Sequence, residues 1–332
     1  MKILIISGFL GAGKTTFIKT MAQRTRRDFV VLENEYGGSG IDTQTLQSDL
    51  SPTAPDINIW ELTEGCVCCS MKDSFANSIL TIANSLDPEY LIVEPTGVAK
   101  LGSLIGNLRQ IQYENIVLLK PLTILDCHNF ESGRKECGDI WLDQLQNAGT
   151  IVFSKSESAD EDTQGALYTE ARSLNAEAQI ITNHYSTCPD SWFSDLLEQY
   201  LDKDFRPPAT ETGAEAEPPE TMTMQGVALK HPEQLILFLN GVTAGTFGRI
   251  LRAKGFLKTG EIWLRFDVVG NRYAITGAEA AEESQTVFIG HGLRRDWLRQ
   301  VLQPAFRFYQ PQDKRLKRAP AGRKPLRPRK SP

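Results

Sequence analysis

The chain has 332 residues, a formal net charge of −5, 41% hydrophobic residues and 23% charged residues. These values are typical of a globular protein of about two domains with a sizeable core. No apolar stretch approaches the roughly 18 residues that span a bilayer, which excludes a membrane-spanning role. We expect a cytoplasmic protein whose six cysteines are reduced thiols, because no export signal is evident.

Short β-branched runs alternate with longer amphipathic stretches over the first two hundred residues. The expected strands are residues 3–6, 29–32, 57–62, 90–94, 116–125, 150–153 and 179–181, and the expected helices include 15–24, 74–86 and 163–174. This alternation predicts an α/β domain over residues 1–202, in which helices flank a mainly parallel sheet. Ligands of such sheets bind at the carboxyl ends of the strands.

The composition changes after residue 202. Residues 203–221 are rich in proline and glutamate and predict a linker. Expected strands at 224–230, 260–269, 272–276 and 286–289, with helices at 232–239 and 294–302, predict a smaller α+β domain over residues 222–310. Val269-Gly270-Asn271-Arg272 is typical of a hairpin turn. Residues 311–332 form a basic, proline-rich tail that we expect to be disordered and solvated, with docking to an acidic client, nucleic acid or anionic lipid as the alternative.

The most informative motif is Gly8-Phe9-Leu10-Gly11-Ala12-Gly13-Lys14-Thr15, which fits G-x-x-x-x-G-K-[ST] directly after an apolar run. Backbone N–H groups of such a loop and the N-terminus of the following helix bind phosphate oxygens. We therefore expect a nucleotide to contact Gly8, Gly11, Ala12, Gly13, Lys14, Thr15 and Thr16. Lys14 would reach the terminal phosphates, and the Thr15 hydroxyl would hold Mg²⁺. A secretory signal peptide needs no Gly-Lys-Thr-Thr sequence, which argues against that alternative.

Three thiols crowd into four positions at Cys66-Val67-Cys68-Cys69. Thiolates are soft ligands, so this spacing predicts a transition-metal site, for which zinc and copper(I) suit best and cobalt and nickel remain open. Glu33, Glu35, Glu64, water or a partner protein are candidates for a fourth ligand. A buried, inert cysteine cluster is the alternative. Cys127-His128 is a further Cys-His pair, which we interpret as structural.

The expected strand at residues 90–94 ends in Glu94-Pro95-Thr96-Gly97. A carboxylate there can organise the Mg²⁺ shell or the attacking water, while the N–H of Gly97 contacts the γ-phosphate. Simple capping of the next helix by Glu94 is the alternative. Glu33-Asn34-Glu35 ends another strand and is either solvated or part of a metal shell.

These motifs together resemble the CobW-like metallochaperone GTPases, relatives of the nickel-handling GTPases that serve urease and hydrogenase. The resemblance rests on Gly8 to Thr16, Glu33-Asn34-Glu35-Tyr36-Gly37, Gly65-Cys66-Val67-Cys68-Cys69 and Glu94-Pro95-Thr96-Gly97, which occur in the family's order. Leu239-Asn240-Gly241, Arg252-Ala253-Lys254-Gly255-Phe256 and Phe288-Ile289-Gly290 look like the family's C-terminal domain.

The resemblance implies a Mg²⁺-dependent GTPase that hydrolyses GTP to GDP and phosphate with a slow basal rate. It implies a transition metal, with zinc or cobalt favoured and nickel a further candidate, bound at Cys66, Cys68 and Cys69. Nucleotide state would be coupled to metal transfer to a client protein. Relatives that serve a eukaryotic aminopeptidase carry a segment before the phosphate loop, so we expect a different client here. A homo-oligomer is left open, and nucleic acid is not expected as a partner.

Three departures from the family pattern affect this expectation. The guanine-reading segment, usually Asn-Lys-x-Asp, is Ser154-Lys155-Ser156-Glu157 here. Glu157 would accept from guanine and Lys155 would cover the base, but Ser154 is a poorer substitute for the amide, which leaves ATP open. Gly38 replaces a glutamate that many relatives carry, and the family's histidine-rich tract is absent.

We expect hydrolysis by in-line attack of water on the γ-phosphate. Lys14 and the amides of residues 11–13 stabilise charge, Thr15 holds Mg²⁺, and Glu94 and Gly97 position the water. The slow basal rate is expected because no arginine finger is evident. Two other functions remain open: a nucleotide-dependent regulator or assembly factor for a cobalamin or corrinoid enzyme, with hydrolysis as a timer, and a P-loop kinase.

Overall fold

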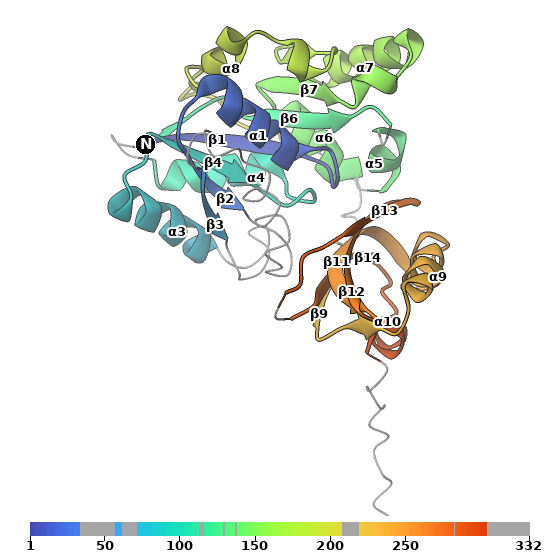
Figure 1. The fold of residues 1–332 in the computed structure, drawn as a ribbon. Coiled ribbons are helices and arrows are strands. Elements are labelled where there is room, and N and C mark those ends of the chain that lie inside the picture. The colour runs from blue at the N-terminus through green and yellow to red at the C-terminus, as the bar shows by residue number, and fades with distance from the viewer. Residues whose placement is uncertain are drawn as a thin grey trace, which may run out of the picture.

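The computed structural model describes residues 1–33, 57–61, 72–112, 116–128, 130–136, 138–207, 219–281 and 283–303. These residues form two sheets, each covered by helices (Figure 1). Among the described residues, every helix is too short or too polar to cross a membrane.

The N-terminal sheet has eight strands in the order β3-β2-β4-β1-β6-β7-β8, and β5 pairs with β1. Its strands are β1 (Lys2–Gly8), β2 (Phe29–Glu33), β3 (Ile57–Glu61), β4 (Tyr90–Glu94), β5 (Val117–Leu118), β6 (Leu122–Asp126), β7 (Thr150–Ser154) and β8 (Gln179–Ile181). The paired strands run parallel throughout. The central strand β1 therefore ends beside the carboxyl ends of β4 and β6.

Helices cover both faces of this sheet. They are α1 (Lys14–Thr25), α3 (Lys72–Ser85), α4 (Leu101–Gln110), α5 (Phe130–Glu136), α6 (Gly138–Gln146), α7 (Glu161–Leu174) and α8 (Asp190–Leu196). Side chains alternate along β1, so Leu4 and Ile6 pack with Phe17 of α1, whereas Ile3 packs with Leu104 of α4. Burial on both faces explains the continuous apolar runs of the central strands. The expected α/β architecture is confirmed.

One expected strand is wrong in its extent. Residues 116–125 were expected to be continuous, but they form β5 and β6, separated by Leu119, Lys120 and Pro121. Proline lacks an N–H and cannot donate within a sheet. The backbone N–H of Lys120 donates instead to the carbonyl of Gln199. Both segments pair with β1, and β6 ends at Asp126 on the carboxyl edge.

The C-terminal sheet has six strands in the order β13-β12-β11-β14-β9, with β10 beside β11. Its elements are β9 (Glu220–Gln225), β10 (Ala228–Leu229), α9 (Pro232–Thr243), β11 (Arg249–Thr259), β12 (Ile262–Val269), β13 (Arg272–Gly277), β14 (Gln285–His291) and α10 (Arg295–Leu302). Phe238 of α9 and Leu298 of α10 pack with Phe266 and Phe288 on one face of the sheet. The expected hairpin turn is confirmed, since Gly270 between β12 and β13 has a φ of 56°.

The boundaries of the C-terminal sheet differ from those expected. Residues 224–230 were expected to form one strand, but Gly226, with a φ of 64°, separates β9 from β10. β9 begins at Glu220, inside the range expected as linker. The basic tail lies outside the described residues.

The 11-residue strand β11 was not anticipated, although its motif was noted. Its sequence alternates basic residues with Ala253 and then Gly255, which lacks the apolar alternation that signals a strand. A Cβ on Gly255 would lie 2.6 Å from the Phe266 ring and 2.6 Å from the Thr286 methyl group. Glycine is therefore required where β11 passes between its two neighbours.

The two sheets meet at a small apolar contact. Leu10 and Val98 of the N-terminal domain pack with Leu251, Val287 and Ile289 of the C-terminal sheet. In Figure 1 the C-terminal domain lies beside the end of the parallel sheet that carries the turn between β1 and α1. The outer face of the C-terminal sheet is thereby directed at the phosphate loop.

Gly8 provides a test of this packing. Replacing Gly8 with Ala places a Cβ closer than 3.0 Å to the Ile124 carbonyl oxygen, at a φ of 141°. We expect Gly8→Ala to lower the free energy of unfolding by about 1–3 kcal/mol or more. The control Gly106→Ala adds a Cβ within α4 with no other atom within 4 Å, and should raise stability by up to about 1 kcal/mol. Urea unfolding of both variants measures the difference, and equal midpoints would contradict the geometry.

Candidate functional site

The phosphate-binding motif lies in the turn between β1 and α1, at the carboxyl end of the central strand. Gly8, Gly11 and Gly13 have φ values of 141°, 74° and 95°, a region that side chains disfavour. Gly13 is the N-cap of α1, so the loop leads directly into the helix N-terminus. The loop therefore leads into the N-terminus of α1, where backbone N–H groups can bind an anion.

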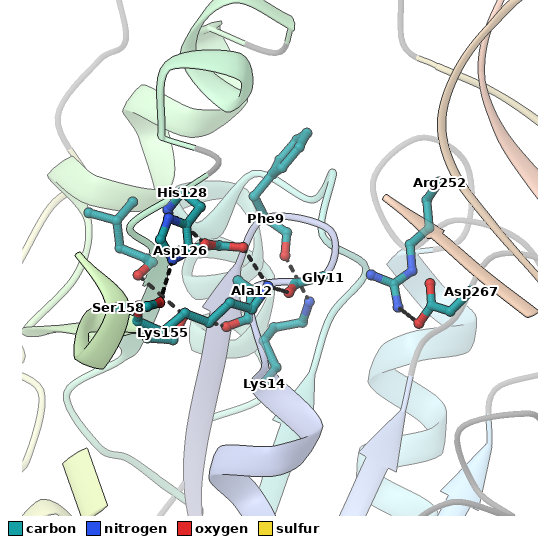
Figure 2. Close-up of polar contacts among 12 residues, drawn as sticks. Phe9, Gly11, Ala12, Lys14, Asp126, His128, Lys155, Ser158, Arg252 and Asp267 are labelled. Carbon is teal, nitrogen blue, oxygen red and sulfur yellow. Dashed lines mark hydrogen bonds and ion pairs between the residues drawn. The ribbon is translucent and has the colours of Figure 1, made fainter. Parts of the chain in front are cut away.

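Lys14 folds back over this loop. Its Nζ donates to the carbonyl oxygens of Gly8 at 3.2 Å and Phe9 at 3.5 Å. The residue is only 8% exposed. A lysine is seldom buried to this extent without partners of opposite polarity. Its ammonium group is thus held at the loop, where Figure 2 shows it beneath Phe9 and Gly11.

Thr15 and Glu94 lie together beside the loop. The Thr15 Oγ1 donates to Glu94 Oε1 at 3.0 Å and lies 3.2 Å from Oε2. A hydroxyl and a carboxylate oxygen are hard ligands of the kind that Mg²⁺ prefers. These two residues fit an Mg²⁺ site, as the sequence predicts for Thr15, and the pairing also places Glu94 at the phosphate loop.

Glu94 is one of three glutamates that end neighbouring strands in register. Glu33 of β2 pairs with Glu94 of β4 on one side and with Glu61 of β3 on the other. Glu33 is 3% exposed, which disagrees with the interpretation of a solvated residue. Three neighbouring strands therefore end in glutamate at this carboxyl edge, two of them before the cysteine motif in the sequence and one after it.

Gly97 lies against the phosphate loop itself. A Cβ there would come closer than 3.0 Å to the Leu10 amide nitrogen. The Gln144 amide donates to the carbonyls of Gly97 at 3.2 Å and Ala99 at 3.0 Å. The segment after β4 thus packs against the loop and is hydrogen-bonded to α6.

The ends of β6 and β7 reach the other side of the loop. The Ser154 Oγ donates to the Ala12 carbonyl at 2.7 Å, and the Lys155 Nζ donates to the Gly11 carbonyl at 3.1 Å. Lys155 also forms an ion pair of 2.6 Å with buried Asp126 (Figure 2). Ser154 therefore holds the loop in place, a role that was not expected for it. Asp126 was missed, although its position at the end of a buried strand signals the carboxyl edge.

Glu157 lies farther from the loop than Lys155 does. Its side chain is 63% exposed and its Oε2 lies 3.9 Å from His184 Nε2. Lys155 itself has a φ of 56°, so the chain turns sharply between the loop contact and Glu157. Of the expected base-reading residues, Ser154 and Lys155 are brought to the phosphate loop, and Glu157 is on the exposed side.

Cys127 and His128 have structural surroundings. Burial raises the pKa of the Cys127 thiol to about 11. The His128 Nε2 lies 2.8 Å from Ser158 Oγ, and its backbone N–H donates to Asp126 at 2.9 Å. A buried thiol that stays protonated is a poor metal ligand. These contacts support the structural interpretation of the pair.

The expected transition-metal residues Cys66, Cys68, Cys69, Glu35 and Glu64 lie outside the described residues. Over the described ranges, no group of three or more His, Cys, Asp or Glu side chains is arranged to hold a metal.

A pocket of about 660 Å³ opens over the phosphate loop. This volume lies within the range of small-molecule sites. Its cationic lining residues are Lys14, Lys19, Lys155, Arg252, Lys254 and Arg272, and its carboxylates are Glu94, Asp126 and Asp267. The excess of cations suits a polyphosphate. Arg252, Lys254 and Arg272 come from the C-terminal sheet and were not predicted, although basic residues spaced two apart in a strand share one face.

Both domains of the chain match known protein families. The model of the CobW/HypB/UreG nucleotide-binding domain matches residues 2–182, and that of the cobalamin synthesis protein cobW C-terminal domain matches residues 220–305. Zinc-regulated GTPase metalloprotein activator 1 of Schizosaccharomyces pombe is 26% identical over 200 residues, covering 59% of this chain and 48% of that protein. Zinc chaperone YjiA of Escherichia coli is 26% identical over 188 residues, covering 54% of this chain and 56% of that protein.

The chain thus spans about half the length of these relatives. A crystal structure of Zn(II)-bound YjiA GTPase from E. coli is 17% identical, with a TM-score of 0.44, and the match covers 91% of this chain and 97% of that chain. The nucleotide-binding model alone matches more than half of the residues, and the matched range includes the loop from Gly8 to Thr15. This chain belongs to the CobW/HypB/UreG family.

Proposed function

We propose that this protein is a Mg²⁺-dependent GTPase that binds a transition metal at Cys66, Cys68 and Cys69 and couples GTP state to metal transfer to a client protein. One observation carries the nucleotide half of the proposal: Lys14, Thr15 and Glu94 converge at a glycine-rich loop beneath a cationic pocket. Relatives named as a GTPase metalloprotein activator and as zinc chaperones support the metal half.

Hydrolysis would use groups that already surround the loop. Lys14 and the loop amides stabilise the negative charge of the β- and γ-phosphates. Thr15 and Glu94 would hold Mg²⁺, which supplies charge neutralisation when bound. Gly97 packs against Leu10, so the segment that contains it would border the γ-phosphate on the side from which water attacks. The fixed loop needs little rearrangement during the reaction, which favours catalysis by positioning.

The base-reading segment supports GTP over ATP, though it acts differently from the family pattern. The Lys155 Nζ contacts the Gly11 carbonyl and Asp126, so the alkyl chain of Lys155 would pack against one face of the base. Glu157 carries the acceptor oxygens that would pair with the guanine imino and amino groups. Its exposed position leaves those oxygens accessible.

Chain connectivity supports coupling between the two sites. Cys66 follows Glu61, the last residue of β3, by five positions, so their Cα atoms lie within about 18 Å of each other. Glu61 is two strands from Glu94, which contacts Thr15. A γ-phosphate that orders this edge of the sheet would change the metal site, and by linkage the metal would change nucleotide affinity.

The proposed function is tested by measuring hydrolysis of GTP and ATP with and without zinc or cobalt. We expect GTP to be preferred, and metal to alter the rate in wild type but not in the Cys66/Cys68/Cys69 to Ser variant. The control Cys188→Ser removes a thiol outside the motif and should behave as wild type. A hydrolysis rate that does not change with zinc or cobalt, and that is the same in the triple variant as in wild type, would refute the metallochaperone assignment.

A cobalamin- or corrinoid-linked client is a second candidate, because the model that matches residues 220–305 is that of a cobalamin synthesis protein. The same assay separates the two candidates. A response to cobalt without a response to zinc would favour the corrinoid-linked client, and the reverse would favour a zinc client.

Glu94 provides a sharper test of the Mg²⁺ site. We expect Glu94→Gln to lower kcat about 100-fold or more and to raise the Mg²⁺ concentration needed for half-maximal rate, because the amide is a weaker ligand than the carboxylate. The control Glu89→Gln removes an exposed carboxylate that pairs with Arg27 and should leave both values unchanged. An unaltered Mg²⁺ dependence in Glu94→Gln would show that Glu94 is not a ligand of Mg²⁺.

A further inference from the structure

The outer face of the C-terminal sheet carries two rows of residues over the phosphate loop. Cross-strand register aligns Ile289, Arg252, Val269 and Arg272 in one row, and Val287, Lys254, Asp267 and Ala274 in the next. Every member of both rows lines the pocket over the loop. The opposite face, with Ala253 and Phe266, belongs to the core under α9 and α10.

A β-bulge in β11 determines which side chains lie on this face. The pairing of β11 with β14 shifts register between Ile250 and Arg252, so Leu251 is an extra residue. Ile250 and Ala253 both pack in the C-terminal core, three positions apart instead of two. Leu251 instead joins Leu10 in the contact between domains. Bulges often redirect side chains beside functional sites, and this one brings Arg252 to the loop.

The side chain of Arg252 extends from β11 to the phosphate loop. Its Nη2 forms an ion pair of 3.1 Å with Asp267 Oδ2, and its side chain is 12% exposed. Its Nη1 would lie 2.8 Å from a Cβ built on Gly11. The guanidinium thus occupies space that any residue other than glycine at position 11 would fill, and Figure 2 shows it pointing toward Gly11 and Lys14.

We propose that Arg252 is a catalytic arginine that the C-terminal domain supplies to the terminal phosphates of the nucleotide. This inference rests on the proposed function, since it assumes a nucleoside triphosphate at the loop. Loop N–H groups and Lys14 bind the β- and γ-phosphates, and Arg252 lies on the open side of the same loop. Its planar fork matches phosphate oxygens better than an ammonium group does.

The reaction explains why a cation is useful here. The water oxygen forms a bond to the γ-phosphorus, and the bond from that phosphorus to the β,γ-bridging oxygen breaks. The electron pair of the broken bond stays on the bridging oxygen, which becomes a β-phosphate oxygen of GDP, and the proton lost by water passes to the released phosphate. Arg252 stabilises the negative charge that grows on the bridging and γ-phosphate oxygens.

The contact between Arg252 and the nucleotide would also link the two domains. Arg252 belongs to β11, so a triphosphate that binds it also holds the C-terminal sheet against the loop. Loss of the γ-phosphate removes that attachment and leaves the ion pair with Asp267. The C-terminal domain therefore senses which nucleotide is bound through a difference in contacts with the two states.

The test compares Arg252→Ala and Arg252→Lys with the control Arg295→Ala. Arg295 forms an ion pair of 3.2 Å with Glu220 in the same domain. Arg295→Ala therefore removes the same kind of ion pair as Arg252→Ala, but outside the pocket over the loop. Single-turnover hydrolysis of GTP gives the rate, and titrations give affinities for GDP and for a non-hydrolysable GTP analogue. Thermal unfolding of Arg252→Lys, which keeps a cation opposite Asp267, checks that the variants fold.

We expect Arg252→Ala to lower the rate about 1,000-fold, as loss of a catalytic arginine does, and Arg252→Lys to lower it at least about 10-fold. Affinity for the GTP analogue should fall about 10-fold, while GDP affinity and the control stay within about twofold of wild type. Wild-type rate and analogue affinity in Arg252→Ala, or an equal loss of GDP affinity, would overturn the proposal. If wild type hydrolyses no GTP, the proposed function fails, whereas the comparison of analogue with GDP still decides the role of Arg252.

Discussion

The phosphate loop depends on approaches that only glycine permits. Gly8 lies against the carbonyl of Ile124, and Gly97 lies against the amide of Leu10, each closer than a Cβ would allow. Hydrogen bonds from Ser154 and Lys155 to loop carbonyls hold the opposite side. Two loop carbonyls are thus bound from the end of β7, while β6 and the segment after β4 pack against the loop, so the protein's own contacts fix its conformation. Such preorganisation is what makes a phosphate site effective, because the donors are not rearranged when charge develops.

The fixed loop explains the charge distribution around it. Lys14 is buried against carbonyl oxygens, and the C-terminal sheet adds Arg252 and Lys254 to the same pocket. The pair between Arg252 and Asp267 is open to solvent on the carboxylate side, where Asp267 is 44% exposed. Water can solvate this carboxylate when a phosphate takes its place beside Arg252, so the pocket between the domains is suited to an anionic ligand that contacts both.

Much of this site could be predicted from the sequence, because its main signals are local. The spacing of Gly8 to Thr15 indicates the loop, and the apolar run before Glu94 indicates a buried strand that ends at the same edge. Contacts between distant segments could not be predicted. The bond from Ser154 to Ala12 joins residues 142 positions apart. Strand β11 was missed because its outer face is charged, and it is charged because it faces the loop. Departures from apolar periodicity are expected at functional sites, where a ligand replaces the usual neighbours.

We propose that one nucleotide is bound between the two domains, by the phosphate loop and by the outer face of the C-terminal sheet. Hydrogen–deuterium exchange of the full chain, with Mg²⁺ and a non-hydrolysable GTP analogue against GDP, tests it most directly. We expect slower exchange with the analogue in the turn between β1 and α1 and, in parallel, in β11, β12 and β13. Slower exchange confined to the N-terminal domain, with the C-terminal strands unchanged between the two nucleotides, would contradict it.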